Sequence, residues 1–158
     1  MKRFSLAVAL LAACALVAPV GAGAVIQIDQ GIGGVRIGNS GAEVRAALGR
    51  PDHVRRGRNA FGRFARYEYT AERMRVTFQG GRRVSLVSTA GVGDRAMSGV
   101  GVGSTEREVG AGIPGVKCET IAGARSCHTN EFRAGQRVTD FIIRGGKVAR
   151  VNVGIVID

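Results

Sequence analysis

The stretch Gly34–Pro51 reads GVRIGNSGAEVRAALGRP, and it carries the start and stop signals of one short helix. Ser40 and Glu43 have the S-x-x-E spacing of a capping box, in which each side chain pairs with a backbone N–H group that the first turn leaves free. Three apolar residues follow at helical spacing: Val44, Ala47 and Leu48. Gly49 suits the left-handed conformation that ends many helices, and Pro51 prevents continuation. We therefore predict a helix that begins after Ser40 and ends at Gly49.

The same signals return 65 residues later, where Gly99–Gly115 reads GVGVGSTEREVGAGIPG. Thr105 and Glu108 form a second capping box, and Val109 and Ile113 form a second apolar stripe. Sliding the chain on itself by 65 residues also superposes several glycines and valines of the two stretches. We interpret the pattern as a tandem duplication, because two units account for the whole chain.

Segments with the alternation of β-strands follow each predicted helix. The alternating residues of the first unit are Ala65, Tyr67, Tyr69, Met74, Val76 and Phe78. Those of the second unit are Thr139, Phe141, Ile143, Ala149, Val151, Val153 and Ile155. Gly80-Gly81 and Gly145-Gly146 are hairpin signals. The last strand is apolar toward its end, so we expect it to be central or covered rather than an exposed edge.

These elements predict an α+β fold of two tandem repeats, each a short helix or helix pair packed on an antiparallel β-sheet. The expected boundaries are 1–24 for a signal peptide, 25–92 for the first repeat and 93–158 for the second. A repeat of about 65 residues buries too little surface to be robust alone, so one compact unit is expected. We also predict a hairpin in each repeat, the first turning around Gly57-Arg58-Asn59 and the second spanning Cys118–Cys127.

Residues 1–24 have the pattern of an export signal. Lys2 and Arg3 give it a positive start, and Phe4–Val17 is an apolar run too short to span a membrane comfortably. Ala22-Gly23-Ala24 is a small-residue cleavage site, so we predict cleavage after Ala24, secretion, and no transmembrane segment in the mature chain. The alternative is a lipoprotein anchored at Cys14, which ends the sequence LAAC; the apolar residues that follow favour simple secretion.

Two cysteines remain in the mature chain, Cys118 and Cys127, and an exported protein meets oxidising conditions. The eight residues between them, ETIAGARS, suit a hairpin that turns at Ala122-Gly123. We therefore predict a disulfide whose Cα atoms lie within about 7 Å of each other. The alternative is a metal site that uses His128 beside Cys127. It offers too few ligands for a structural zinc, so neither a metal nor a cofactor is expected.

The charge of the mature chain is concentrated in its first half. Without Lys2 and Arg3 the chain has 21 basic and 12 acidic residues, and residues 31–90 alone hold 12 basic and 4 acidic ones. This asymmetry favours an anionic partner, either an acidic protein or an anionic component of the cell envelope. The alternative is a solvated basic face without a partner, since nearly all of the basic residues are arginine.

The first repeat also contains a band of arginine and tyrosine residues, which are frequent in protein interfaces. Its members are Arg55, Arg56, Arg58, Arg63, Arg66, Tyr67 and Tyr69. We predict that they form a binding surface; the alternative is that the tyrosines belong to the core and the arginines are merely solvated. No nucleic-acid-binding motif is present, and an exported protein rarely meets nucleic acid.

The sequence contains no G-x-S-x-G elbow, no H-E-x-x-H pair and no phosphate-binding loop. His53 and His128 lie in no recognisable catalytic spacing. Gly31–Gly34 lacks the Lys-Ser/Thr ending of a phosphate-binding loop, and is expected to be a flexible entry to the first helix. We therefore expect no enzyme activity.

The helix stretch has the spacing G-x-[ST]-x3-V-x3-L-G-x-P, carried by Gly38, Ser40, Val44, Leu48-Gly49 and Pro51. This spacing resembles the signature of the SmpA/OmlA (BamE-type) envelope domains and of the related tandem β-lactamase inhibitory proteins. The resemblance implies a helix or helix pair on a four-stranded antiparallel sheet, doubled here, exported, and used for binding other proteins. No inhibitory residue is carried over, because nothing outside the helix motif matches.

The function we expect is that of a secreted, non-enzymatic protein-binding module, inhibitor-like in kind. A first alternative is a cell-envelope structural protein that binds an anionic polymer or lipid surface through its basic first repeat. A second is a hydrolase with unrecognised catalytic residues. Salt alone would abolish binding to a polymer, whereas binding to a protein would also need specific side chains.

Overall fold

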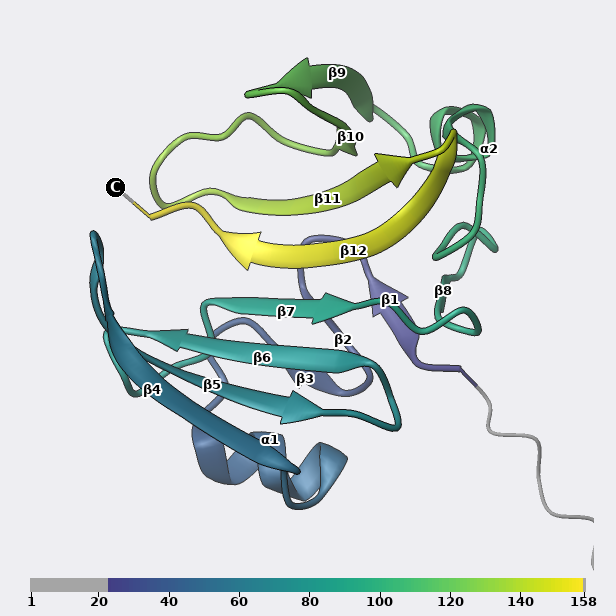
Figure 1. Cartoon of the computed structure of the whole chain (residues 1–158). Coiled ribbons are helices and arrows are strands. Elements are labelled where there is room, and N and C mark those ends of the chain that lie inside the picture. Colours follow the sequence, from purple (N-terminus) through teal and green to yellow (C-terminus); the bar gives the residue numbers. More distant parts are fainter. Residues whose placement is uncertain (1–22, 158) are drawn as a thin grey trace, which may run out of the picture.

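An eight-stranded antiparallel sheet is the main feature of the computed structural model, which describes residues 23–157 (Figure 1). Its strands are β4 (His53–Asn59), β5 (Gly62–Tyr69), β6 (Met74–Gln79), β7 (Leu86–Thr89), β9 (Lys117–Ile121), β10 (Ala124–His128), β11 (Arg137–Arg144) and β12 (Lys147–Ile155). They lie in the order β4-β5-β6-β7-β12-β11-β10-β9. The strands of the two halves of the chain therefore meet at β7 and β12, which pair directly in the middle of the sheet.

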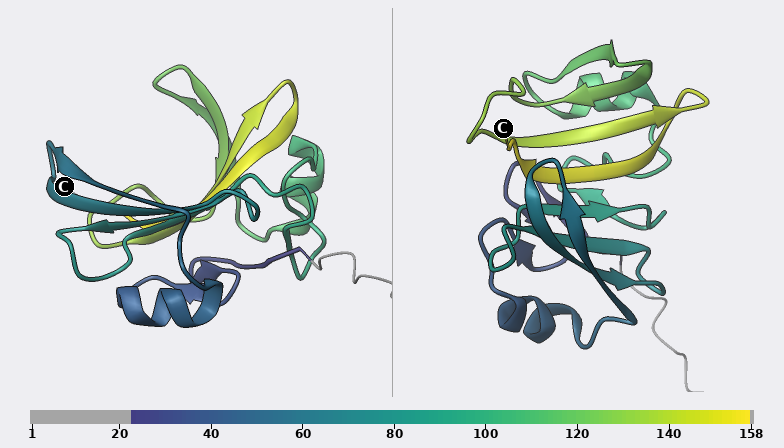
Figure 2. Two further views of the ribbon diagram at one scale, coloured as in Figure 1. Left: turned by 60° about the horizontal axis from the view of Figure 1, so that its bottom comes forward. Right: turned by 60° about the vertical axis from the view of Figure 1, so that its left-hand side comes forward.

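A second, smaller sheet and two helices pack on one side of the large sheet (Figures 1 and 2). The small sheet consists of β1 (Val25–Gln27), β2 (Gly31–Ile32), β3 (Val35–Arg36) and β8 (Arg95–Ala96), in the order β3-β2-β1-β8. The helices are α1 (Gly41–Leu48) and α2 (Glu106–Gly112). In Figure 2 (left) the large sheet bends into a trough, and these elements lie on its outer side.

The hydrophobic core lies between the large sheet and the elements on its outer side. Along β6 and β12 the residues alternate, so that one face of each strand is apolar and buried. Val76, Val87 and Val153 are adjacent on neighbouring strands, and Val44 of α1 and Val109 of α2 are fully buried in the same core. The apolar residues of the alternating pattern therefore form the face of the sheet that the helices and the small sheet cover.

Both predicted capping boxes are confirmed. The Ser40 hydroxyl accepts a hydrogen bond from the Glu43 backbone N–H, and the Glu43 carboxylate accepts one from the Ser40 N–H at 2.7 Å. Thr105 and Glu108 repeat this pairing at the start of α2. Gly49 has φ +78°, a backbone conformation that residues with a side chain rarely adopt.

The predicted fold class is wrong. Strands account for 48% and helices for 11% of the structure, and the chain is not two helix-on-sheet repeats but one large antiparallel sheet. Each helix has only two turns, so neither forms a layer of its own. The prediction failed because the β7–β12 pairing joins strands 60 and more residues apart, and no local signal indicates such a pairing.

Three smaller expectations have different outcomes. The last strand, β12, is central, as predicted, because β7 and β11 pair with its two sides. The hairpin predicted around Gly57-Arg58-Asn59 instead turns after Asn59, at Ala60-Phe61. Gly31–Gly34 is not a flexible entry, since Gly31–Ile32 is strand β2 of the small sheet.

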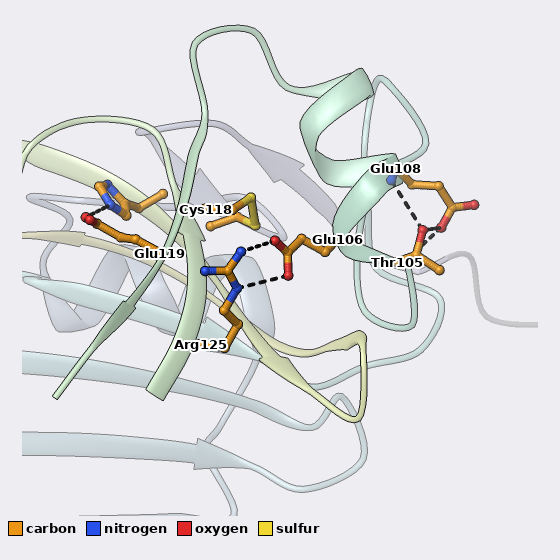
Figure 3. The surroundings of a disulfide bond; sticks show 8 residues. Thr105, Glu106, Glu108, Cys118, Glu119 and Arg125 are labelled. Carbon is orange, nitrogen blue, oxygen red and sulfur yellow. Dashed lines mark hydrogen bonds and ion pairs between the residues drawn. A yellow bond between two sulfur atoms is a disulfide. The ribbon is translucent and has the colours of Figure 1, made fainter. Parts of the chain in front are cut away.

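The Cys118–Cys127 disulfide is present, with the Cα atoms 3.9 Å apart. The two residues face each other on β9 and β10. Within residues 23–157, the one cluster of three potential metal ligands consists of Glu106 and these two cysteines. Both sulfurs are consumed by the disulfide, and the Glu106 carboxylate pairs with the Arg125 guanidinium (Figure 3). The cluster therefore has no thiolate to offer a metal ion.

The predicted signal peptide lies almost entirely outside the described residues, since the description begins at Gly23. Within the described range, neither helix is long and apolar enough to cross a membrane.

Candidate functional site

The inner side of the trough is the candidate functional surface, and we call it the open face. No helix or strand among residues 23–157 covers it (Figure 2). Side chains directly opposite each other in an antiparallel sheet project from the same face. The register therefore assigns one residue of each strand to a single row across the open face: His53, Glu68, Arg75, Ser88, Asn152, Asp140, His128 and Lys117. All eight are polar or charged.

The register divides the predicted arginine–tyrosine band between the two faces of the sheet. Arg55 and Arg66 are opposite each other on the open face. Because side chains alternate along a strand, the other five belong to the opposite face: Arg56, Arg58, Arg63, Tyr67 and Tyr69. The seven residues therefore do not form one continuous surface.

The two tyrosines pack under α1. Tyr69 is only 3% exposed, and its hydroxyl donates to the Gly49 carbonyl that ends the helix. Burial raises the pKa of the Tyr69 hydroxyl above its ordinary value. Tyr67 is half-buried against Phe78, and its hydroxyl accepts a hydrogen bond from Arg45 at 2.8 Å. Both side chains thus help to hold α1 on the sheet.

Two of the other arginines have a role at the edge of the sheet. Arg56 and Arg58 lie on β4, an outermost strand whose seven residues are all exposed. An exposed edge presents unpaired backbone groups to other chains, and positive side chains on it discourage edge-to-edge pairing. This role explains Arg56 and Arg58 without any ligand.

Four arginines cluster at one end of the open face, and we call them the arginine cluster. Its members are Arg66, Arg75, Arg144 and Arg150. Burial lowers the pKa of Arg150, and the positive charges of the other three lower it further. Among the described residues, no acidic side chain forms an ion pair with any of the four. The cluster is therefore an uncompensated positive charge on an uncovered surface.

A pocket of about 260 Å³ opens beside the arginine cluster. Arg73, Arg75 and Arg150 line it together with Ser88 and Glu68. Arg55 on the neighbouring strand pairs with Glu68 at 3.2 Å, which leaves the three arginines of the pocket in excess. Arginine presents several N–H donors in a plane, an arrangement that matches a carboxylate or phosphate.

The middle of the row contains a polar network. The Ser88 hydroxyl donates to Asn152 at 2.8 Å, and Asp140 follows on the next strand. The Oδ1 atom of Asp140 is buried and has no hydrogen-bond partner within residues 23–157. Burial raises the pKa of this carboxyl, although the nearby Ser126, His128 and Asn152 oppose the shift.

Apolar side chains surround the other end of the open face. Phe132, in the loop between β10 and β11, is 46% exposed, and it lines two shallow grooves of about 210 Å³ each. One groove contains Leu86 and Val138, and the other contains Ile121 and Ile142; Asp140 lies in both. Phe61 and Ile157 are also exposed, beside a further hollow that Arg66 lines.

His128 supports the loop that carries Phe132. The imidazole is 1% exposed, and its ring lies 4.7 Å from that of Phe132, measured between centroids. Its Nδ1 atom is 2.8 Å from the Asn130 carbonyl oxygen, and its Nε2 atom is 2.8 Å from Glu119 Oε1. Both ring nitrogens face acceptor oxygens, so neither offers a free lone pair to a metal. The metal alternative considered for His128 therefore does not fit.

Most of the open face was missed at the level of sequence. The sequence signal for the open face is the set of polar residues that alternate with the apolar core residues. They are Arg75 and Thr77 on β6, and Arg150 and Asn152 on β12. In an isolated sequence such residues look like solvated positions. Only the register shows that they join those of the other strands on one face of the sheet.

Two solved structures have a similar fold. An extracellular protein containing a SCP domain from Bacillus anthracis str. Ames has a TM-score of 0.52 at 11% identity, over 75% of this chain and 44% of that chain. The uncharacterized protein yfeY from Escherichia coli has a TM-score of 0.50 at 17% identity, over 80% of this chain and 97% of that chain.

At these identities the likeness concerns the fold alone. This chain spans less than half of the Bacillus anthracis protein. No protein-family model matches the chain, and a search of curated proteins finds no match either. The resemblance to SmpA/OmlA domains and β-lactamase inhibitory proteins stays a prediction; neither similar structure carries such a name. The chain shares a sheet architecture with an extracellular protein and with yfeY.

Proposed function

We propose that the chain is an exported, non-enzymatic binding protein whose open face binds an acidic protein. The observation that carries the proposal is the arginine cluster, four arginines without acidic partners on a sheet face that no described helix or strand covers. Like charges that lie close together repel one another, so an acidic surface placed over them gains electrostatic energy. The disulfide and the leader-like first residues support export.

The apolar residues around the face favour a protein over a charged polymer. Protein interfaces combine arginine with aromatic and apolar side chains, and a few such residues supply most of the binding energy. Phe132 and Ile121 border one groove, and Phe61 borders the hollow that Arg66 also lines. A purely anionic polymer would make no use of them. The expected partner therefore presents carboxylates to the arginine cluster and an apolar or aromatic side chain to Phe132.

Asp140 adds a requirement for the partner. The Asp140 side chain lines both grooves beside Phe132, so a group that donates a hydrogen bond fits there better than another acceptor. A tyrosine or tryptophan side chain combines an apolar body with such a donor.

A hydrolase is less well supported. Ser88, Asp140 and His128 are the residue types of a catalytic triad, and they belong to one row of the open face. However, Ser88 donates to Asn152, and His128 contacts Asn130 and Glu119 instead of a serine. A nucleophile must lie within hydrogen-bond reach of its base, and here two strands separate them.

Polymers of defined chemistry test the proposal without knowledge of the natural partner. Binding of the purified protein is measured to polyglutamate, to a glutamate–tyrosine copolymer of equal charge, and to polyphosphate. We expect the copolymer to bind most tightly. Arg75→Ala and Arg150→Ala should each weaken its binding by about tenfold, which corresponds to about 1.4 kcal/mol.

Two further variants distinguish a protein partner from an anionic polymer and test where the binding surface lies. Arg56→Ala removes the same charge from the opposite face and should change binding little, whereas Phe132→Ala should weaken binding of the copolymer but not of polyglutamate. Tightest binding to polyphosphate, insensitive to Phe132→Ala, would favour the envelope-polymer alternative. Equal effects of Arg56→Ala and Arg75→Ala would place the binding surface elsewhere.

A further inference from the structure

The start of the mature chain can be inferred from contacts at the first described residues. The sequence offers two overlapping small-residue cleavage sites, Val20-Gly21-Ala22 and Ala22-Gly23-Ala24. Sequence alone favoured the second. We infer that the leader is cleaved after Ala22, so that Gly23 is the first residue of the mature protein.

Ala24 is built into the fold through both of its backbone polar groups. Its N–H donates to Asp94 Oδ1 at 2.7 Å, and its carbonyl accepts from the Arg95 N–H at 3.1 Å. The latter bond continues the parallel pairing of β1 with β8, in which Val25 is opposite Arg95. Cleavage after Ala24 would remove both hydrogen bonds and shorten the ladder between these strands.

Asp94 makes the first of these bonds important. The residue is only 5% exposed, and its other carboxylate oxygen accepts from the Thr89 hydroxyl. A buried carboxylate needs donors to replace the water that it has lost. A chain that begins at Gly23 keeps the Ala24 donor and adds a positive amino terminus one residue away from it.

Gly23 also matches its surroundings as a glycine. It lies against Gly93, and a Cβ atom at position 23 would come within 2.0 Å of the Gly93 carbonyl oxygen. No side chain fits there without a shift of the backbone. Gly23 thus meets a requirement of the folded domain, whereas a cleavage site after Ala24 would place no requirement on the residue between Ala22 and Ala24.

The step itself is a hydrolysis of the peptide bond between Ala22 and Gly23. Water supplies the hydroxyl group that completes the Ala22 carboxylic acid and the proton that completes the Gly23 amine. The membrane-bound peptidase of the exporting cell supplies the catalysis, and it reads small side chains at the first and third positions before the bond. At this site those residues are Ala22 and Val20.

N-terminal sequencing and intact-mass measurement of the exported full-length gene product test the inference. We expect a sequence that begins Gly23-Ala24-Val25. A mature chain that begins at Val25, and therefore lacks the mass of Gly23 and Ala24, would overturn the inference. A chain with a lipid-modified Cys14 would overturn it as well.

A matched pair of leader variants gives a second test that does not depend on folding. Val20→Asp disables only the site after Ala22, and Ala24→Gln disables only the site after Ala24. We expect Ala24→Gln to be processed at Gly23 like the parent. Val20→Asp should accumulate as precursor or shift its start to Val25. The reverse pattern would refute cleavage after Ala22. These measurements involve no binding, so they stand apart from the proposed function.

Discussion

On the open face, burial disfavours the ionised form of the Asp140 carboxyl. This carboxyl is partly buried, one of its oxygens has no hydrogen-bond partner among residues 23–157, and burial raises its pKa. Groups of this kind are common where a protein binds or reacts, because an unsatisfied group is stabilised only when a ligand supplies the missing partner. On the proposed function, Asp140 would link the stability of the sheet to binding at the open face.

Asp140→Asn should stabilise the protein at pH 7. A raised pKa in the folded state means that the protonated carboxyl favours folding, and this contribution is lost as the pH rises through the folded-state value. The amide carries no charge, so the variant should gain on the order of 1 kcal/mol at neutral pH. Denaturant midpoints measured across the acid range check this.

The pH dependence of this gain in stability shows whether it comes from the removed charge or from altered packing. The advantage of Asp140→Asn should shrink as the pH falls toward about 4, the ordinary pKa of an aspartate, because the parent carboxyl then becomes neutral as well. An advantage that persists unchanged below that pH would point to packing rather than charge. If Asp140 also receives a donor from the partner, the same variant should bind the glutamate–tyrosine copolymer less tightly.

At the scale of elements, the helices depend on their capping boxes. Each helix has only two turns, so the unpaired N–H groups at its start are a large part of its backbone. The pKa values of Glu43 and Glu108 are lowered, chiefly by the backbone hydrogen bonds that they accept from Ser40 and Thr105. Their ionised forms therefore stabilise the folded state.

Ser40→Ala should destabilise the protein by about 1 kcal/mol, and Thr105→Ala by a similar or smaller amount. The denaturant midpoint should fall at unchanged slope. Ser98→Ala, which removes an exposed hydroxyl outside both caps, is the control and should have little effect. The lowered pKa values of Glu43 and Glu108 contribute stability that is complete only above the unfolded-state pKa. Part of the stability of the protein should therefore be lost as the pH falls below about 5. An unchanged midpoint in Ser40→Ala would show that its hydroxyl does not support α1.

The two edges of the large sheet are protected in different ways. At β4 the exposed strand carries arginines. At the other edge, the disulfide joins β9 to β10, and Arg125 on β10 pairs with Glu106 at the start of α2 (Figure 3). A disulfide that closes a short loop stabilises by roughly 2–3 kcal/mol, mainly because it restricts the unfolded chain. The disulfide thus secures β9, the outermost strand, which is attached to the sheet only through β10.

At the scale of the whole molecule, one aspartate ties the start of the chain to its second half. Asp29 lies in the turn between β1 and β2 with φ +58°, a conformation that aspartate tolerates better than most residues. Its carboxylate accepts hydrogen bonds from the hydroxyls of Thr129 and Thr139, at 2.6 and 2.9 Å, and from the Asn130 amide at 3.0 Å. The small sheet is therefore attached directly to β11.

Asp29→Ala should destabilise the protein by about 2–3 kcal/mol, because it leaves several partly buried donors without their acceptor. Asp29→Asn keeps the backbone preference and half of the acceptors, so it should be less harmful. Unfolding should remain a single transition, since β7 and β12 pair the two halves of the chain in one sheet. Separate transitions for residues 25–92 and 93–158, seen by hydrogen exchange, would contradict this coupling.

The sequence by itself determined the features that depend on neighbours within about ten residues. Both capping boxes, the Gly145-Gly146 hairpin, the central position of the last strand and the disulfide were predicted correctly. The interacting groups of the capping boxes, the hairpin and the disulfide are close in the chain. For the last strand, the apolar composition alone indicates that it is covered. Net positive charge can also be counted directly, and the anionic partner that it favours stays a prediction.

Only the tertiary structure decided which residues share a face. The fold class depended on the β7–β12 pairing and on the attachment of β1 to β8, contacts between segments far apart in the chain. The same register separated Arg56 and Tyr67 from Arg55 and Arg66, and brought Arg66 together with Arg150. The physical reason is the two-residue period of a strand: a shift of one position moves every side chain to the other face, and the partner strands that prevent such a shift are distant in sequence.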